Sequence, residues 1–178
     1  MILFLGLAGS GKSTQGHLLA AHLNCPWIST GNLLREYADK ETQKKMLRGE
    51  IVSDEDTLQV LDQEFRRIDA GQRQFVLDGS PRTMRQAQWL VEKARNGELK
   101  ITAAIHLEVP KPTAKDRLLS RQRPDDHEEA IAERFREYDE NIKPIIKYLK
   151  EEGFKVYKVD ASGTADHINS EIRQTLGV

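Results

Sequence analysis

The first residues that could carry out chemistry form a glycine-rich loop directly after a short apolar run. Gly6-Leu-Ala-Gly-Ser-Gly-Lys-Ser13 fits the spacing G-x-x-x-x-G-K-[S/T] at every fixed position. Glycine permits backbone conformations that are closed to other residues, so successive N–H groups can point inward at phosphate oxygens. We expect Lys12 to reach the β- and γ-phosphates of a nucleoside triphosphate, and Ser13 to offer its hydroxyl to Mg²⁺. By itself, this P-loop indicates a nucleotide or a related phosphate ligand.

An acidic residue closes a second apolar run, Phe75-Val76-Leu77-Asp78. In P-loop proteins an acid at such a position holds Mg²⁺, directly or through a bound water. Many strands end in Asp only because Asp favours turns, so Asp78 alone would not distinguish the two roles. Beside a P-loop the metal role is the better interpretation. Ser13 and Asp78 are therefore the predicted Mg²⁺ residues, acting largely through water.

Four arginines are the third feature with chemical potential. Arg117 and Arg121 lie one helical turn apart and share a face, Arg123 follows on a loop, and Arg134 belongs to the next helical pattern. Phosphoryl transfer develops charge on equatorial oxygens, so positioned cations do most of the catalytic work. An acceptor that is itself an α-phosphate group is already an anion at pH 7 and needs no general base. Taken singly, each arginine is equally compatible with an ion pair on a solvated helix face.

These residues must be positioned by short β-type runs that alternate with longer helical patterns. The expected strands are Ile2–Leu5, Trp27–Ser29, Phe75–Leu77, Ala103–Leu107 and Phe154–Val159. The expected helices are Lys12–His22, Leu33–Tyr37, Asp54–Ile68, Thr83–Arg95, Thr113–Ser120, Glu128–Lys150 and Ala165–Thr175. The alternation predicts an α/β fold, a three-layer P-loop NTPase domain with a five-stranded parallel sheet and helices on both faces.

Ligands in such sheets bind beyond the carboxyl ends of the strands. The chemistry is therefore expected where the runs end, at Gly6, at Ser29–Gly31, at Asp78 and near Asp160. Farther along, Asp126-His-Glu-Glu129 fits a capping box with acids in the first helical turn. We interpret that segment as structural and expect His127 to be exposed.

Composition narrows the class of protein. The 178 residues suit one domain, and 27 Lys+Arg against 28 Asp+Glu argue against a nucleic-acid partner bound through a basic face. The single cysteine, Cys25, excludes a disulfide within the chain and a thiolate-rich zinc site. The apolar start is short and is followed at once by glycines and Lys12, so we expect no membrane partner and a cytoplasmic protein.

Several linked segments resemble the adenylate kinase family in their order and spacing. They are Lys12–Gln15, Ile28–Arg35, Gly49–Glu55, Leu77–Thr83, Arg121–Asp126 and the helix that carries Arg134, Tyr138 and Pro144. The resemblance covers nearly the whole chain. It implies a nucleoside monophosphate kinase that transfers the γ-phosphate of ATP to AMP, giving two ADP, with Mg²⁺ as the cofactor.

The resemblance also implies a role for individual residues. The AMP site would comprise Thr30, Arg35, Met46, Val52, Gly79, Arg82 and Gln86. The ATP site would comprise Gly9, Ser10, Gly11, Lys12, Ser13, Thr14, Arg117 and Thr164. The transferred phosphoryl group would be surrounded by Lys12, Arg82, Arg121, Arg123 and Arg134.

The chain departs from the family pattern in three places. Asn32 stands where the family usually has Asp, and Ser80 replaces an aromatic residue. Relatives carry a loop or a small lid domain between the arginines that match Arg121 and Arg123, whereas here only Gln122 intervenes. We expect one P-loop kinase domain over 1–178, with a monophosphate-binding helical insert at about 29–52 and a vestigial lid at about 121–126. Closure over the substrates is then expected chiefly from movement of the insert. We expect a monomer, with a homo-oligomer as the alternative.

Two other functions remain open at this point. One is a P-loop kinase for a different acceptor, such as UMP, CMP or a small hydroxylated metabolite. Gln86 with Thr30 favours adenine, because a Gln amide can pair with both a ring nitrogen and the exocyclic amine. The other is a nucleotide-dependent switch or an NTPase without an acceptor. The sequence contains no N-K-x-D segment of the kind that reads guanine in such switches.

Overall fold

Five parallel strands form the centre of the molecule in a computed structural model that describes residues 1–37 and 39–178. Their bounds are β1 Ile2–Gly6, β2 Trp27–Ser29, β3 Val76–Asp78, β4 Ala103–Glu108 and β5 Val156–Asp160. The order across the sheet is β2-β3-β1-β4-β5. The predicted α/β fold is confirmed. Ala38, inside the predicted insert 29–52, lies outside the described residues.

The helices follow the predicted order. They are α1 Lys12–His22, α2 Thr30–Tyr37, α3 Lys40–Leu47, α4 Asp54–Arg67, α5 Met84–Arg95, α6 Lys111–Arg121, α7 Glu128–Glu151 and α8 Ala165–Leu176. No helix in the described part of the chain is both long and apolar enough to cross a membrane.

Three differences from the expected elements have a physical explanation. The second helix begins at Thr30 instead of Leu33, directly after β2, although Thr, Gly and Asn are weak helix formers. Helix α3 was not predicted as a separate element, because its sequence is almost wholly polar and has little apolar periodicity. The fifth strand starts at Val156 rather than Phe154, because the Phe154 N–H donates to Leu149 O and completes the turn after α7.

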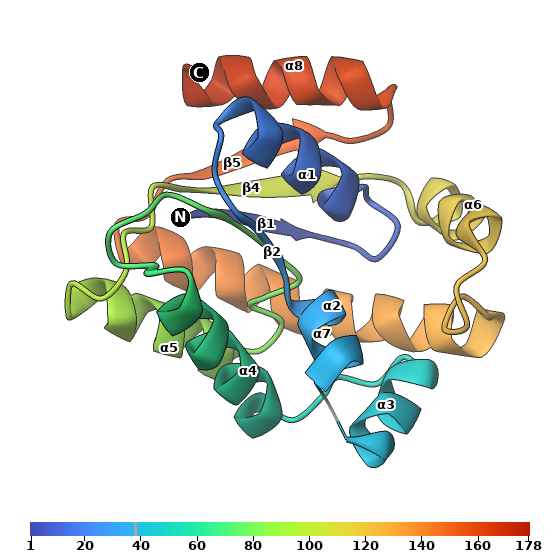
Figure 1. Ribbon diagram of the computed structural model, residues 1–178. Helices are drawn as coiled ribbons and strands as arrows, with labels where there is room; N and C mark the ends of the chain where they lie inside the picture. The colour runs from blue at the N-terminus through green and yellow to red at the C-terminus, as the bar shows by residue number, and fades with distance from the viewer. Residues whose placement is uncertain (38) are drawn as a thin grey trace.

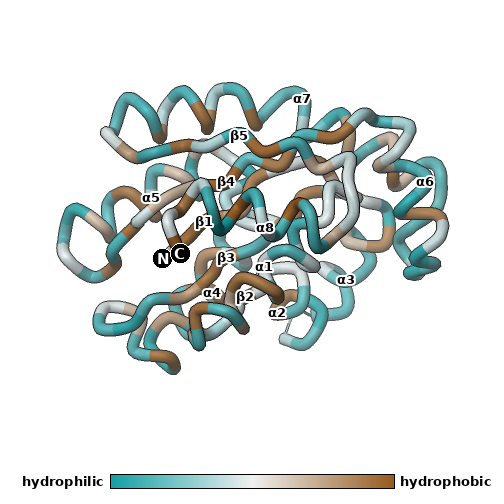
Figure 2. Tube along the Cα trace, turned by 90° about the horizontal axis from the view of Figure 1, so that it is seen from above, coloured by the Kyte–Doolittle hydropathy of each residue, from teal (hydrophilic) through white to brown (hydrophobic). Residues whose placement is uncertain are grey.

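The sheet has helices on both faces, as Figure 1 shows, with α1 and α8 on one side and α4, α5 and α7 on the other. The alternation of β1 explains this arrangement, because successive side chains of a strand point to opposite faces. Leu3 and Leu5 pack in the core cluster beneath α4, α5 and α7, whereas Ile2 and Phe4 pack in the cluster beneath α1 and α8. Figure 2 shows the hydrophobic residues gathered along the strands and the hydrophilic ones along the outer sides of the helices.

The central strand β1 leads directly into the glycine-rich loop, which therefore lies at the carboxyl end of the sheet. Gly9, with φ of +81°, lies so close to α6 that a Cβ atom there would stand 2.3 Å from Ala114 O. Only glycine can occupy this position, since the left-handed backbone and the close approach both exclude a side chain. Gly11 then caps α1 with φ of 92°, so the loop ends directly at the helix N-terminus.

Candidate nucleotide-binding and phosphoryl-transfer site

A large cavity of ≈ 350 Å³ lies beyond the carboxyl ends of the strands. Its wall includes most of the predicted ATP-binding, catalytic and metal residues, namely Gly9, Gly11, Lys12, Ser13, Thr14, Asp78, Arg82, Arg117, Arg121, Arg123 and Arg134. Predicted residue Ser10 lies beneath the loop, with 0% exposure, and its N–H donates to Leu7 O at 3.0 Å. The loop therefore surrounds a space large enough for a nucleotide phosphate chain, at the place where a parallel sheet binds ligands.

Lys12 is folded over the loop that precedes it. Its Nζ donates to Gly6 O and to Leu7 O, each at 2.9 Å. Burial lowers the pKa of Lys12 to about 8, Asp78 acts in the opposite direction, and nearby arginines lower it further. An ammonium in this condition gains from any anion that enters the cavity, because attraction to the anion offsets the hydration that the charged group lost on burial.

The two predicted metal residues are in direct contact. The Ser13 hydroxyl donates to Asp78 Oδ2 at 2.6 Å, and Asp78 is only 3% exposed at the end of β3. A hydroxyl and one carboxylate are hard oxygen ligands, which suit Mg²⁺ when waters and phosphate oxygens complete its octahedron. Among residues 1–37 and 39–178, no group of three His, Cys, Asp or Glu side chains is placed to hold a metal alone. The donor set thus fits an ion that arrives with a nucleotide.

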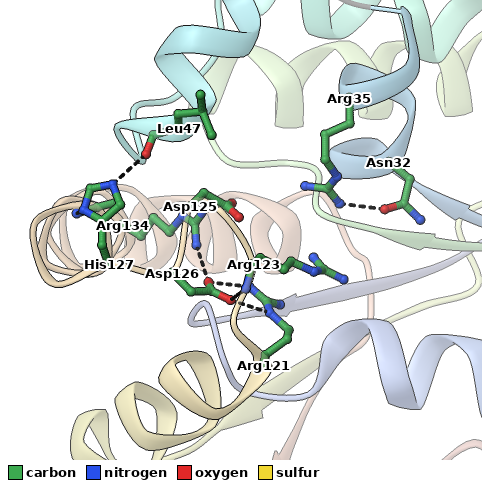
Figure 3. A network of polar contacts seen from close by, with 10 residues as sticks. Asn32, Arg35, Leu47, Arg121, Arg123, Asp125, Asp126, His127 and Arg134 are labelled. Carbon is green, nitrogen blue, oxygen red and sulfur yellow. Dashed lines mark hydrogen bonds and ion pairs between the residues drawn. The ribbon is translucent and has the colours of Figure 1, made fainter.

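A buried carboxylate organises the arginines (Figure 3). Asp126 Oδ1 accepts from Arg121 Nη2 at 2.7 Å and from Arg134 Nη1 at 3.2 Å, while Oδ2 accepts from Arg121 Nε at 2.9 Å. Asp126 Oδ2 also accepts from the backbone N–H of Arg123 at 3.1 Å. The adjacent Asp125 pairs with Arg134. The two acids thus hold the guanidinium groups of Arg121 from α6 and Arg134 from α7, together with the backbone of the turn at Arg123.

This arrangement corrects the interpretation of the start of α7. Asp126 does not cap the helix, because its carboxylate is fully buried and committed to guanidinium groups. The N-cap is His127, whose Nδ1 accepts from Ala130 N at 3.5 Å. His127 is exposed, as expected, yet its Nε2 also lies 3.0 Å from Leu47 O at the end of α3. The imidazole therefore links the insert to α7.

The arginine cluster carries more positive charge than its acids offset. Burial together with the neighbouring Arg82, Arg121, Arg35 and Arg123 lowers the pKa of Arg134 to about 10. A guanidinium is so basic that only dense positive surroundings and desolvation bring its pKa down this far. Such a site favours a ligand with several negative charges.

Arg117 lines the large cavity, whereas the predicted ATP residue Thr164 is not part of its wall. Arg117 Nη1 donates to Ala161 O at 2.8 Å, and its Nη2 lies 3.4 Å from Ser162 O. Thr164 caps α8, where its hydroxyl accepts from the backbone N–H of His167 at 3.3 Å. Arg117 thus ties α6 to the loop after β5, the segment that contains the predicted ATP-site residue Thr164.

A smaller cavity of ≈ 60 Å³ adjoins the large one. All seven residues predicted for AMP line it, namely Thr30, Arg35, Met46, Val52, Gly79, Arg82 and Gln86. The Thr30 and Ser80 hydroxyls are buried in its wall and have no hydrogen-bond partner among the described residues. Unpaired polar groups at such depth are costly unless a ligand satisfies them. The pocket is therefore built to receive a polar molecule.

The departure at Asn32 retains a polar contact. Asn32 Oδ1 accepts from Arg35 Nη2 at 2.6 Å, so the neutral amide still orients this arginine (Figure 3). Arg35 is in turn surrounded by cations, and burial with Arg123, Arg121 and Arg82 lowers its pKa. A carboxylate at position 32 would have added a negative charge near the phosphate site. Its absence leaves Arg35 more fully available to an anion.

Comparison with known proteins agrees with this geometry. A sequence model of the adenylate kinase family matches residues 4–154. The chain belongs to the adenylate kinase family. An adenylate kinase of Corynebacterium urealyticum is 36% identical over 174 residues, covering 94% of both chains. One of Nocardia farcinica is 35% identical over 182 residues, covering 99% of this chain and 98% of its own.

A further relative differs in length. The adenylate kinase of Archaeoglobus fulgidus is 32% identical over 212 aligned positions, which cover 98% of this chain and 97% of its own. The alignment is longer than the 178 residues of this chain, so the archaeal protein has segments that are lacking here. The two shorter alignments show relatives close to this chain in length, so membership of the adenylate kinase family does not require the extra segments.

Sequence reasoning missed three residues that the structure brings into the site. Asp125 and Asp126 hold the arginines, and the pair of acids directly after Arg123 was the available signal. Asp54 contacts the predicted base reader Gln86 at 2.9 Å. Its position at the start of a helix concealed this role, since acids are common there for electrostatic reasons.

Proposed function

We infer that this chain transfers the γ-phosphate of ATP to AMP, giving two ADP. The observation that carries the inference is that Arg35, Arg82 and Arg134 line both the large and the small cavity. Two phosphorylated ligands in adjoining cavities would therefore present their phosphates to the same guanidinium groups. This juxtaposition suits direct transfer, for which the reacting groups must be held in line.

We propose that the reaction proceeds without a general base. An oxygen of the AMP phosphate forms a bond to the γ-phosphorus, and the bond from that phosphorus to the β–γ bridging oxygen breaks. Lys12, Arg82, Arg121, Arg123 and Arg134 stabilise the charge on the transferred group and on the departing ADP oxygen. Asp126 keeps two of these guanidinium groups in place before the substrates arrive.

The metal role is assigned to the contact between Ser13 and Asp78. When bound with the nucleotide, Mg²⁺ would neutralise phosphate charge, and these two residues would hold it largely through water. Asp78 lies between β1 and β2 in the sheet, paired in register with Phe4 and Ser29. The carboxylate is thus fixed by the sheet rather than by a loop, as suits a metal ligand.

We propose that a single turn replaces the lid of longer relatives. Gln122 ends α6 in the left-handed conformation, with φ of 55°. This turn aims Arg121 and Arg123 at the same cavity with no residues left over for a flap. The domain at 1–178 then closes by movement of the insert 29–52 over the monophosphate, and we propose that the protein acts as a monomer.

A coupled assay for ADP tests the proposed function and its main alternatives together. ADP formation from ATP should require an added monophosphate, and AMP should be preferred to CMP, UMP and GMP. Gln86→Ala should raise the KM for AMP and leave the KM for ATP nearly unchanged, because Gln86 lines only the smaller cavity. Equal kcat/KM for AMP and CMP would contradict the assignment of the acceptor. ADP formation at the same rate without any monophosphate would indicate an NTPase.

A further inference from the structure

The side-chain amide of Gln86 is held at both of its ends. It is 1% exposed and lines the smaller cavity. Its Oε1 accepts from the backbone N–H of Arg82 at 2.8 Å, and its Nε2 donates to Asp54 Oδ1 at 2.9 Å. A primary amide has two N–H donors and two lone pairs. Within the described part of the chain, each contact uses one of them, which leaves one donor and one acceptor for a ligand.

The neighbours of this amide have fixed hydrogen-bonding directions. The Thr83 hydroxyl accepts from the backbone N–H of Gln86 at 3.2 Å, so its own hydrogen is free to donate to Asp54 Oδ1 at 2.7 Å. An ionised carboxylate can only accept, and a backbone N–H can only donate. Exchanging the two ends of the amide would therefore set oxygen against the carboxylate of Asp54 and NH₂ against the N–H of Arg82.

The position of Asp54 strengthens this constraint. Asp54 lies in the first turn of α4, and Thr83 caps the first turn of α5, so two helix N-termini meet at this carboxylate. The positive ends of both helix dipoles favour a negative charge here. Asp54 is also partly buried, which strengthens its hydrogen bonds relative to bonds in water.

We propose that Asp54 is a positioning residue that determines base specificity, by locking the Gln86 amide in the orientation that accepts adenine and rejects 6-oxopurines. The inference rests on the proposed function, in which Gln86 reads the acceptor base. Adenine offers an acceptor at N1 and a donor at its 6-amino group, which match the N–H and the lone pair of the locked amide. Guanine and hypoxanthine offer a donor at N1 and an acceptor at O6. Against the locked amide, the N1 donor of the 6-oxopurine faces the amide N–H, and its O6 acceptor faces the amide oxygen.

A 6-oxopurine could bind well only if the amide turned over. That rotation breaks the contacts to Asp54 and Arg82. It leaves the amide oxygen facing the Asp54 carboxylate and the amide NH₂ facing the backbone N–H of Arg82. A site that loses a buried hydrogen bond in this way discriminates by about tenfold or more for each mispaired contact. Arg82 contributes through its backbone, which no substitution other than proline removes. Of the two partners that hold the Gln86 amide, Asp54 is therefore the one that can be tested by mutation.

The test compares AMP with IMP, because IMP carries the 6-oxopurine edge without the extra 2-amino group of guanine. Dissociation constants for both are measured by calorimetry, and kcat/KM for both is measured at fixed ATP. The variants are Asp54→Asn, which keeps the shape of the side chain, and Asp54→Ala. The control is Glu55→Gln, which removes one negative charge from the same helical turn. Glu55 is exposed and its carboxylate lies 3.8 Å from Arg85, away from the amide. Circular dichroism verifies that each variant is folded.

We expect the parent protein to prefer AMP over IMP by at least about tenfold. Both Asp54 variants should reduce this ratio at least about fivefold, with the KM for ATP within about twofold of the parent. Glu55→Gln should leave the ratio unchanged. A ratio that stays constant in both Asp54 variants, or that changes equally in Glu55→Gln, would overturn the inference. Asp54-dependent selectivity in binding without any turnover would support the lock and contradict the proposed function, so the two can fail separately.

Discussion

The carboxylate of Asp126 accepts two hydrogen bonds from the guanidinium of Arg121, from Nε at 2.9 Å and from Nη2 at 2.7 Å. This paired geometry fixes the plane of the guanidinium as well as its position. The carboxylate is fully buried and also accepts from Arg134. A negative charge in the centre of a phosphate site opposes phosphate binding unless it serves to place the cations. We interpret Asp126 as such a positioning group.

Asp126→Asn should therefore lower kcat more than it raises either KM. The amide accepts through one oxygen only, so Arg121 and Arg134 lose part of their common anchor. We expect kcat to fall by about 10- to 100-fold, together with a lower melting temperature, because an unpaired buried guanidinium is destabilising. Steady-state kinetics with both substrates and thermal unfolding provide the measurement. Asp139→Asn is the control, since Asp139 is an exposed acid paired with Lys111. Similar kcat values for Asp126→Asn and Asp139→Asn would refute the positioning role.

The ATP affinity should depend on pH through Lys12. The pKa of Lys12 is lowered from 10.5 to about 8, chiefly by burial. The free protein therefore loses this positive charge as the pH rises through about 8, whereas bound phosphates favour the protonated form and raise the pKa. ATP binding should weaken above this pH and should be accompanied by proton uptake. Calorimetry in two buffers with different ionisation enthalpies measures that uptake.

Lys12→Ala serves as the control for the pH dependence, because it removes the titrating group. The variant should bind ATP more weakly at neutral pH and should show a much smaller change in affinity between pH 7 and pH 9.5. A parent protein whose ATP affinity is constant over that interval, with no proton uptake, would show that the Lys12 ammonium is not perturbed.

Two glycines provide a matched test of how closely the insert packs on α7. Gly49 has φ of +80°, and a Cβ atom there would lie 2.4 Å from Ala130 O. Gly97 has a similar φ of +76°, but no described atom would lie within 4 Å of its Cβ. Gly97→Ala should cost about 1 kcal/mol, from backbone strain alone. Gly49→Ala should cost at least about 2 kcal/mol and should raise the KM for AMP, because the alanine pushes the wall of the smaller cavity away from α7. Urea denaturation compares the two, and equal costs would show that the contact with Ala130 is not tight.

The insert should be the part of the molecule that closes. With only Gln122 between Arg121 and Arg123, the segment over the ATP side has no length to move, so closure is left to the insert. The end of α3 in the insert reaches the N-cap of α7 through the contact between His127 and Leu47. Hydrogen exchange with and without a bisubstrate dinucleoside polyphosphate should show new protection chiefly in 29–52. Light scattering establishes whether the protein is a monomer. Strong protection of 117–128 in a monomer, with 29–52 unchanged, would contradict this account of closure.

The sequence was sufficient for the sheet and for most helices, because apolar strands and amphipathic helices alternate with regular periods. The P-loop could be located for the same reason, since its glycines and Lys12 follow a strand and precede a helix. The helical start at Thr30 could not be predicted, because weak helix formers are held there by the neighbouring strand end rather than by local preference.

The roles of the acids required the structure. Asp126 and Asp54 both stand at the start of a helix, where acids are common, and nothing in their local sequence indicates that one anchors arginines and the other an amide. These partners come from separate elements that meet only in the folded chain. Gln86 could be assigned to the AMP site from the family resemblance, and it lines the smaller cavity. The orientation of its amide could not be predicted, because it depends on the contact with Asp54.

The proposed transfer is tested most directly by following the γ-phosphate itself. ATP labelled at its γ-phosphate is mixed with AMP and the protein, and the products are separated at early times. We expect one labelled ADP for each ATP consumed, and we expect it only when AMP is present. We also expect Lys12→Ala, with its fold intact, to lower kcat/KM by about 100-fold or more. Label released as inorganic phosphate at a rate independent of AMP, or near-parental transfer by folded Lys12→Ala, would contradict the proposed transfer.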